Sequence, residues 1–101
     1  MTNEKWVSLL GLANRARKVI SGEELVIKEV RNGRAKLVIL AKDASKNTSK
    51  KVLDKCKYYR VPVVYSETRE QLGRAIGKES RVAAAVIDSG FAKKLATMFY
   101  D

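Results

Sequence analysis

The sequence contains no histidine and a single cysteine, and these shortages narrow the chemistry open to it. Without histidine, the chain lacks the side chain that most often serves as a general base near neutral pH. Cys56 has no second cysteine for an internal disulfide and no histidine to activate it or to share a metal ion. We therefore expect no enzymatic activity, no metal site and no cofactor, and we interpret Cys56 as a small buried residue of a helix.

Nucleotide-binding and membrane signals are also missing. No Gly-x-Gly-x-x-Gly or Gly-x-x-x-x-Gly-Lys-Ser/Thr motif follows a predicted strand, so nothing supports a nucleotide cofactor or a small-molecule substrate. No apolar run is long enough to span a bilayer, and residues 1–5 lack the basic-then-apolar pattern of a signal peptide. These absences predict a cytoplasmic protein without a membrane partner.

What the chain has in excess is positive charge. Lys and Arg number 21 against 11 Asp and Glu, which gives a net charge of +10 over 101 residues. Such a balance points to a polyanionic partner, nucleic acid first and an anionic membrane second. The length suits one domain with a modest core, and no linker or repeat divides it. We expect a single, monomeric domain over residues 1–101.

Hydrophobic periodicity predicts helices and strands that alternate along the chain. The predicted strands are short apolar runs between turn residues, at residues 19–20, 36–41, 61–65 and 82–87. The predicted helices carry apolar stripes at helical spacing, at about residues 3–16, 22–32, 48–60, 68–76 and 91–99. This alternation predicts an α/β fold, a three-layer α/β/α sandwich with a four-stranded mixed sheet and about five helices.

Two helix starts have the pattern of a capping box, in which each side chain bonds the other's unpaired backbone N–H. These pairs are Ser21 with Glu24 and Thr68 with Gln71. The first start follows a glycine, Gly22, in a strongly basic chain. Because a helix start exposes unpaired N–H groups at the positive end of the helix dipole, residues 21–28 are also a candidate site for phosphates or base edges. In that interpretation the N–H groups of residues 22–24 would contact the ligand.

The basic residues fall into two groups. The first group belongs to loops and helix starts that we expect to meet at one end of the sheet: Lys18, Lys28, Lys42, Arg69, Lys78 and Arg81. The second group lies on the predicted third helix, where exposed lysines are first interpreted as a solvated face: Lys46, Lys50, Lys51, Lys55 and Lys57. On that helix Val52, Cys56 and Tyr59 share the apolar face, and we interpret Tyr58, Tyr59 and Tyr65 as core or strand residues rather than a base-stacking platform.

The order and spacing of several segments together resemble one known family. These segments are residues 10–18, 21–28, 41–44, 61–63, 72–77 and 82–88. They resemble the kink-turn-binding ribosomal proteins of the L-seven-Ae and L-thirty type, in particular their small bacterial YlxQ/YbxF-type branch. The resemblance implies an α/β/α sandwich and, as partner, a kink-turn, which is a bent RNA helix with a short bulge flanked by sheared G·A pairs. It also implies that the helix after the first strand enters the RNA groove.

The family motif at that helix is Gly-Thr-Asn-Glu-x-x-Lys. Gly22 and Lys28 match it, whereas Glu23, Glu24 and Leu25 stand where the motif has Thr, Asn and Glu. In the loop before the last strand, residues 78–81, only Glu79 matches the family. The RNA-binding residues expected on the combined grounds are Lys18, Gly22, Glu23, Glu24, Leu25, Lys28, Lys42, Asp43, Arg69, Lys78, Glu79, Ser80 and Arg81.

A protein–protein adaptor is the alternative that the sequence leaves open. In that case the lysine-rich third helix would dock on the ribosome or on a translation factor, and RNA contact would be incidental. Charge reversal at Lys50 and Lys57 would abolish docking in the adaptor and barely change kink-turn binding in the RNA-binding protein.

Overall fold

The apolar run at residues 36–41 becomes an inner strand of a four-stranded sheet in the computed structural model, which describes residues 5–99. The sheet has the strand order β1-β4-β2-β3. Its strands are β1 (Val19–Ser21), β2 (Leu37–Ala41), β3 (Val63–Ser66) and β4 (Ala83–Val86). Strands β2 and β3 are parallel, and β4 is antiparallel to both β1 and β2. The carboxyl ends of β1, β2 and β3 therefore lie at the same end of the sheet, beside the start of β4.

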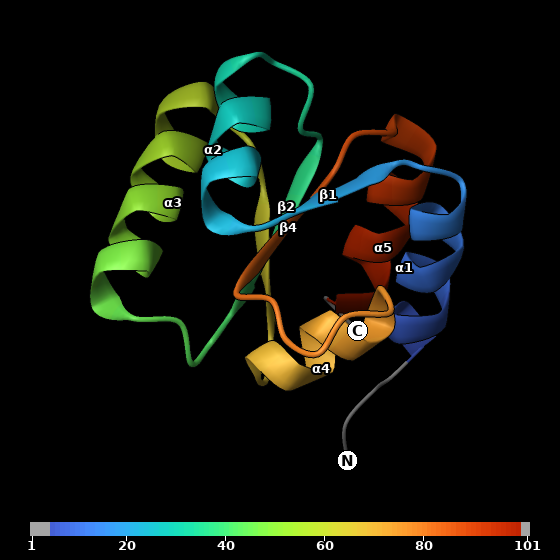
Figure 1. The fold of residues 1–101 in the computed structure, drawn as a ribbon. Coiled ribbons are helices and arrows are strands. Elements are labelled where there is room, and N and C mark those ends of the chain that lie inside the picture. The colour runs from blue at the N-terminus through green and yellow to red at the C-terminus, as the bar shows by residue number, and fades with distance from the viewer. Residues whose placement is uncertain (1–4, 100–101) are drawn as a thin grey trace.

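Within the described part of the chain, five helices cover the two faces of this sheet (Figure 1). They are α1 (Lys5–Arg15), α2 (Glu23–Arg31), α3 (Lys46–Tyr59), α4 (Arg69–Ala75) and α5 (Ser89–Phe99). Helices α2 and α3 lie side by side on one face, and α1, α4 and α5 cover the other (Figure 1). The three-layer α/β/α sandwich and the mixed sheet predicted from the sequence are thereby confirmed.

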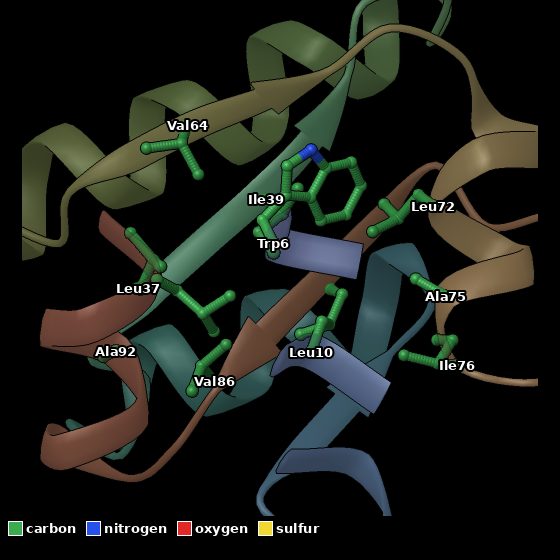
Figure 2. Packing of buried hydrophobic residues seen from close by; sticks show 12 residues of the cluster. Trp6, Leu10, Leu37, Ile39, Val64, Leu72, Ala75, Ile76, Val86 and Ala92 are labelled. Carbon is green, nitrogen blue, oxygen red and sulfur yellow. The ribbon is translucent and has the colours of Figure 1, made fainter. Parts of the chain in front are cut away.

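Side chains that alternate along β2 divide the core into two halves. Leu37 and Ile39 pack with Trp6 and Leu10 of α1 beneath the three-helix layer (Figure 2). Val38 and Leu40 pack in the other half, with side chains of α2 and α3. All five residues of β2 are buried, as expected for a strand with helices on both faces. The two halves together fix both helical layers to one rigid sheet.

Strand β4 keeps one helical layer close to the sheet. Ala83 and Ala85 are fully buried in the same cluster as Val26 and Val30 of α2. Their small side chains let α2 pack close to the sheet. The start of α2 therefore lies directly beside the start of β4.

One of the two predicted capping boxes is wrong. Ser21 is the last residue of β1, and Gly22 is the N-cap of α2 without any side-chain cap bond. The other cap is confirmed, because Thr68 Oγ1 accepts a hydrogen bond from the Gln71 N–H at 3.0 Å. Gln71 Oε1 in turn accepts from the N–H of Glu67 at 2.9 Å, one residue before the cap.

Other differences concern helix ends and aromatic residues. Helix α3 begins two residues earlier than predicted, because Ser45 accepts the Thr48 N–H and caps it. The predicted start of the first helix near residue 3 lies outside the described residues. The three tyrosines were expected to be core or strand residues, and Tyr65 is a residue of β3. None of them is in the core, because 78% of Tyr58, 41% of Tyr59 and 43% of Tyr65 is exposed.

Candidate nucleic-acid interface

Four connections meet where β1, β2 and β3 end and β4 begins. We call this surface the loop end and define it as residues 21–25, 41–43, 66–69 and 78–82. Backbone hydrogen bonds join its parts: Gly22 N–H donates to Ala83 O at 3.0 Å, and Lys42 N–H donates to Ser66 O at 3.0 Å. Arg81 N–H donates to Arg69 O, also at 3.0 Å. The prediction that these loops meet at one end of the sheet is therefore confirmed.

The start of α2 presents backbone donors at the loop end. Gly22 has φ 104° and ψ 142°, a conformation that side-chain-bearing residues avoid. A Cβ placed on Gly22 would meet nothing within 4 Å, so its backbone is open to a ligand. The first helical bond of α2 runs from Val26 N–H to Gly22 O. Within residues 5–99, the N–H groups of Glu23, Glu24 and Leu25 have no acceptor.

These free donors differ by one residue from the expected set. The Gly22 N–H, expected to contact the ligand, is already bonded to Ala83 O. The three free donors are instead those of residues 23–25, at the positive end of the α2 dipole. This corner of the molecule can accept a phosphate or the acceptor edge of a base.

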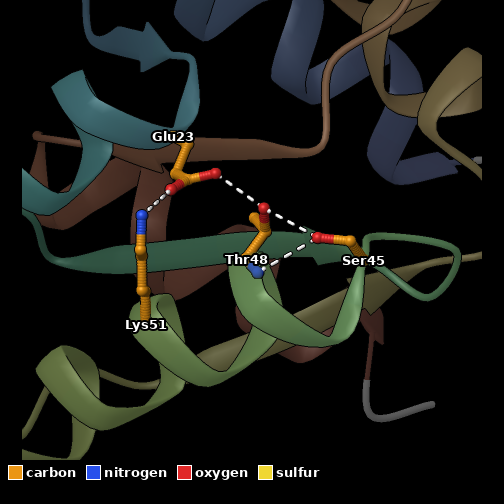
Figure 3. A network of polar contacts seen from close by, with 4 residues as sticks. All are labelled: Glu23, Ser45, Thr48 and Lys51. Carbon is orange, nitrogen blue, oxygen red and sulfur yellow. Dashed lines mark hydrogen bonds and ion pairs between the residues drawn. The ribbon is translucent and has the colours of Figure 1, made fainter.

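Glu23 is directed toward α3 rather than toward solvent (Figure 3). Its carboxylate accepts a hydrogen bond from Thr48 Oγ1 at 2.6 Å and another from Lys51 Nζ at 3.1 Å. The Thr48 hydroxyl, followed by Lys51, holds the pKa of the Glu23 carboxyl below its ordinary value. Ser45 completes the network by accepting from the Thr48 N–H. The network fixes the start of α2 against the start of α3.

Beside this network lies an open hollow lined by residues 22–25 and Lys51. Glu24 and Leu25 are exposed at its rim, and 54% of Leu25 is accessible. Lys28 is exposed one helical turn further along the same side of α2 and is in no ion pair within residues 5–99. The hollow thus combines free N–H donors, two carboxylates, one apolar side chain and the ammonium group of Lys51, with Lys28 nearby.

Two expected phosphate-binding cations are engaged in ion pairs. Lys42 Nζ lies 2.7 Å from Glu67 Oε2. Arg69 lies 3.6 Å from the Asp43 carboxylate, and its guanidinium also donates to the Asp43 carbonyl oxygen at 2.6 Å. Because both pairs are about half exposed, each is worth little in stability and can open. In the free protein these four side chains brace the loops against one another.

Arg81 links the loop before β4 to the end of β1. Its Nε donates to Ser21 Oγ at 3.1 Å, and its Nη1 donates to Ser80 O at 2.7 Å. No carboxylate within residues 5–99 pairs with this guanidinium. Lys78 and Glu79 are exposed in the same loop. The hydroxyl expected to cap α2 therefore orients an unpaired cation instead.

Helix α4 holds this loop in place through a close backbone contact. Lys78 N–H donates to Gly73 O at 2.8 Å. A Cβ on Gly73 would lie 2.5 Å from Ser80 Cα. Only glycine permits this approach, so Gly73 positions the loop although the sequence analysis did not single it out.

Lys18 lies away from the loop end, contrary to its expected place among those basic residues. It precedes β1, and its carbonyl oxygen accepts the N–H of Ile87, just beyond the end of β4. Lys18 is thus at the opposite end of the sheet.

The side chains that the sequence analysis missed are Thr48 and Glu67, whose partners lie 25 residues away in the chain. Only Ser45 had a local signal, as a serine just before a helix.

The lysines of α3 form a separate basic surface. All five are exposed, and two are in ion pairs, Lys50 with Asp54 at 3.5 Å and Lys51 with Glu23 at 3.1 Å. Tyr58 follows them and contacts Tyr59 edge to face, with ring centroids 4.8 Å apart.

Within residues 5–99 no helix is long and apolar enough to cross a membrane. Among the same residues, no cluster of acidic or cysteine side chains is placed to hold a metal ion.

Comparison with known sequences finds a match over most of the chain. Residues 4–96 match the model of the Ribosomal protein L7Ae/L30e/S12e/Gadd45 family. The "RNA-binding protein YlxQ" of Bacillus subtilis (strain 168) is 64% identical over 98 residues, which cover 97% of this chain and 98% of that one. The protein of the same name from Enterococcus faecium is 48% identical, covering 90% of this chain and 87% of that one.

Comparison with solved structures finds the same architecture. A protein from Bacillus halodurans C, described as of unknown function, superimposes with a TM-score of 0.93 at 54% identity and covers 96% of this chain and 98% of that one. The Giardia lamblia 15.5kD RNA binding protein superimposes with a TM-score of 0.77, covering 99% of this chain and 89% of that one. At 24% identity, the second likeness shows the shared fold alone.

Proposed function

Because this chain belongs to the Ribosomal protein L7Ae/L30e/S12e/Gadd45 family, we propose that it binds structured RNA at a kink-turn through its loop end. The observation that carries the proposal is the start of α2, where three backbone N–H groups that have no acceptor among residues 5–99 adjoin the open backbone of Gly22. RNA offers phosphate oxygens and base acceptors that satisfy such donors. The names of the Bacillus subtilis and Enterococcus faecium relatives support RNA as the partner.

Each exposed side chain around the hollow has a role in this proposal. The Glu24 carboxylate accepts hydrogen bonds from guanine N–H groups. Leu25, with 54% of its surface exposed, packs against a base or a ribose. Glu23 acts indirectly, since its carboxylate is held by Thr48 and Lys51 and fixes the direction of the helix.

The phosphate contacts come first from cations that no carboxylate neutralises. These are Lys28, Lys78 and Arg81, none of which is in an ion pair within residues 5–99. Lys42 and Arg69 are paired with Glu67 and Asp43, so they position loops and contribute less to affinity. With about three phosphate contacts, log K is expected to fall with log[salt] at a slope of about two to three.

The wider proposal follows from the same premise. We expect a monomer that acts on ribosomal or other structured RNA in the cytoplasm, binds no cofactor and catalyses no reaction. The family and the compared relatives carry names of ribosomal and RNA-binding proteins rather than enzymes.

A titration with two matched RNAs tests the proposal. One RNA contains a kink-turn, and the other has its G·A pairs replaced by Watson–Crick pairs; each is titrated at two salt concentrations. We expect tight binding to the kink-turn RNA alone. Equal, salt-sensitive binding to both RNAs would contradict kink-turn recognition and leave only attraction to phosphates.

Two lysine variants localise the contact. Lys28→Ala is expected to weaken kink-turn binding by about three- to tenfold, as the loss of one phosphate contact. Lys18→Ala removes a lysine that is also exposed but lies at the opposite end of the sheet, and it should leave the Kd unchanged. If Lys18→Ala weakens binding as much as Lys28→Ala, the RNA is not confined to the loop end.

A further inference from the structure

The outer surface of α3 carries lysines and a tyrosine of which only Lys51 takes part in the site at the loop end, through Glu23. We call this surface the α3 face and define it by six exposed side chains: Lys46, Lys50, Lys51, Lys55, Lys57 and Tyr58. Asp54 is the one acidic residue in the sequence of α3, and its carboxylate is paired with Lys50. Lys46, Lys55 and Lys57 are in no ion pair within residues 5–99. The face is therefore strongly positive.

Part of the α3 face forms one row that begins beside the RNA site. Lys51, Lys55 and Tyr58 follow one another at i, i+4 and i+7, the spacing of a single helical stripe. The stripe lies on the side of α3 that faces the start of α2, because Lys51 Nζ contacts the Glu23 carboxylate there. At 1.5 Å per residue the row extends about 10 Å along α3 from the hollow. Helices α2 and α3 lie side by side over this length (Figure 1).

Tyr58 ends the row with an exposed aromatic ring. Its exposure of 78% is higher than that of the other exposed large apolar or aromatic residues among the described ones. Tyr59 contacts it edge to face, at an interplanar angle of 75°. One neighbour in this orientation limits the motion of the ring without covering both of its faces. The ring contributes little to the core and offers an exposed aromatic surface for stacking.

We propose that the α3 face binds a single-stranded RNA segment that continues from the structured RNA held at the loop end. The inference rests on the proposed function, since it takes RNA as the ligand of the neighbouring site. Lysines attract the phosphates, and Tyr58 stacks on a base, which is the combination that single strands recognise. A duplex would offer the lysines its phosphates but no free base face to the ring. An acidic protein segment would use the charge and leave the exposed ring without a role.

The test compares three RNA probes: a kink-turn with blunt ends, the same kink-turn with a single-stranded uridine extension, and the uridine strand alone. Each is fluorescently labelled and titrated with the intact protein. Tyr58→Ala is expected to weaken binding of the uridine strand by about tenfold, the loss of one stacked base. Tyr58→Phe keeps the ring and should retain that binding. Blunt kink-turn binding should be the same in all three proteins.

Two double variants that each remove two lysines, one pair from α3 and one from α5, complete the experiment. Lys55→Ala combined with Lys57→Ala should weaken uridine-strand binding and reduce its salt slope by about 1.4. Lys93→Ala combined with Lys94→Ala removes two exposed lysines of α5 on the other side of the sheet and should change neither quantity. Far-UV circular dichroism should be unchanged throughout, since every substituted side chain is exposed.

Three outcomes would overturn the inference. One is that the uridine strand does not bind the intact protein; another is that it binds and Tyr58→Ala does not weaken it. The third is that α3 variants lose binding to an acidic polyglutamate peptide while RNA binding is intact, which makes the face a protein-binding surface. Failure of the blunt kink-turn to bind, with uridine binding still dependent on Tyr58, would overturn the proposed function and the continuity of the two sites, and would leave only a single-stranded RNA site on the α3 face.

Discussion

The loop end and the α3 face are both rich in basic residues, but they use them differently. At the loop end, Lys42 and Arg69 are matched with Glu67 and Asp43, so that opposite charges hold neighbouring loops together. On the α3 face, Lys46, Lys55 and Lys57 have no such partners within residues 5–99. Lys78 and Arg81 of the loop end are unpaired within the same residues too, but the four basic residues of that surface lie among five acidic ones, whereas the five lysines of the α3 face have only Asp54 beside them in α3.

This difference suggests a division of labour in RNA binding. Phosphate attraction is independent of sequence and falls with salt, whereas backbone donors fixed in space select shape and base edges. The loop end has the fixed donors, at residues 23–25, the open backbone of Gly22, and a loop, residues 78–82, that is held closely against Gly73 of α4. We therefore expect changes in backbone shape to damage binding at the loop end more than changes in charge do, and changes in charge to be the main way to weaken binding at the α3 face.

Gly73→Ala is the substitution expected to have the largest effect. Its new Cβ would lie 2.5 to 2.8 Å from three backbone atoms of Ser80, and backbone cannot move aside cheaply. We expect a loss of about 3 kcal/mol in the free energy of unfolding, at the upper end for overpacking, measured by urea denaturation. Kink-turn affinity should fall as well, because residues 78–82 are displaced.

Gly90→Ala is the control for this prediction. Its Cβ would meet only a side-chain oxygen, Asp88 Oδ2, at 3.2 Å. Stability should change by less than about 0.5 kcal/mol, as for substitutions away from tight packing. Equal stabilities for the two alanine variants would show that the contact between α4 and residues 78–82 does not constrain the loop end.

Gly22→Ala is expected to have the second-largest effect. At φ 104° an alanine is strained although its Cβ has room, and we expect a loss of about 2 kcal/mol in stability. The new methyl group also lies where the RNA backbone would approach. Kink-turn affinity, measured below the denaturation temperature, should therefore fall by more than partial unfolding explains. An affinity equal to that of the parent protein would separate the α2 start from the RNA site.

The sequence predicted the features of this site that depend on local pattern. Periodicity located the buried strand β2, and the alternation of elements predicted both layers and the meeting of the loops. The Thr68 cap was predicted correctly because Gln71 lies three residues further along the same chain segment.

What could not be predicted depends on contacts between distant segments. Ser21 has the local pattern of a cap, but pairing with Ala84 makes it a strand residue and its hydroxyl accepts from Arg81. Glu23 was predicted to contact the ligand, but its carboxylate accepts a hydrogen bond from Thr48, which lies 25 residues away in the chain. The sequence around Lys18 does not indicate at which end of the sheet this residue lies. Which residues contact RNA stays a prediction.

Glu23→Gln gives a smaller effect that depends on pH. Since folding lowers the pKa of Glu23 below its ordinary 4.5, the ionised carboxylate stabilises the fold fully above that pH. This stabilisation is lost as the pH falls through the lower pKa of the folded state. We expect the variant to melt at a lower temperature than the parent at pH 7, and the two melting temperatures to converge in strong acid. Glu24→Gln, in the same helical turn but outside the network, is the control for the helix dipole.

A constant difference in melting temperature between the parent and Glu23→Gln from pH 7 down to pH 2 would contradict the network of Figure 3. It would mean that the carboxyl group of Glu23 stabilises the protein equally in both protonation states. An NMR titration of the Glu23 side chain gives the same comparison directly.

Glu67→Gln has the smallest expected effect and tests the comparison most directly. It removes the carboxylate 2.7 Å from Lys42 Nζ, so that a cation of the loop end becomes as free as those of the α3 face. Stability should change by less than about 1 kcal/mol, because the pair is exposed. Kink-turn affinity should rise by about two- to threefold at low salt, and the salt slope should steepen by up to about one phosphate contact. Glu70→Gln removes an exposed acid of α4 that pairs with no cation within residues 5–99, and it should raise affinity less. If both variants raise affinity equally, net charge alone sets the attraction and the pairing of Lys42 with Glu67 does not limit RNA binding.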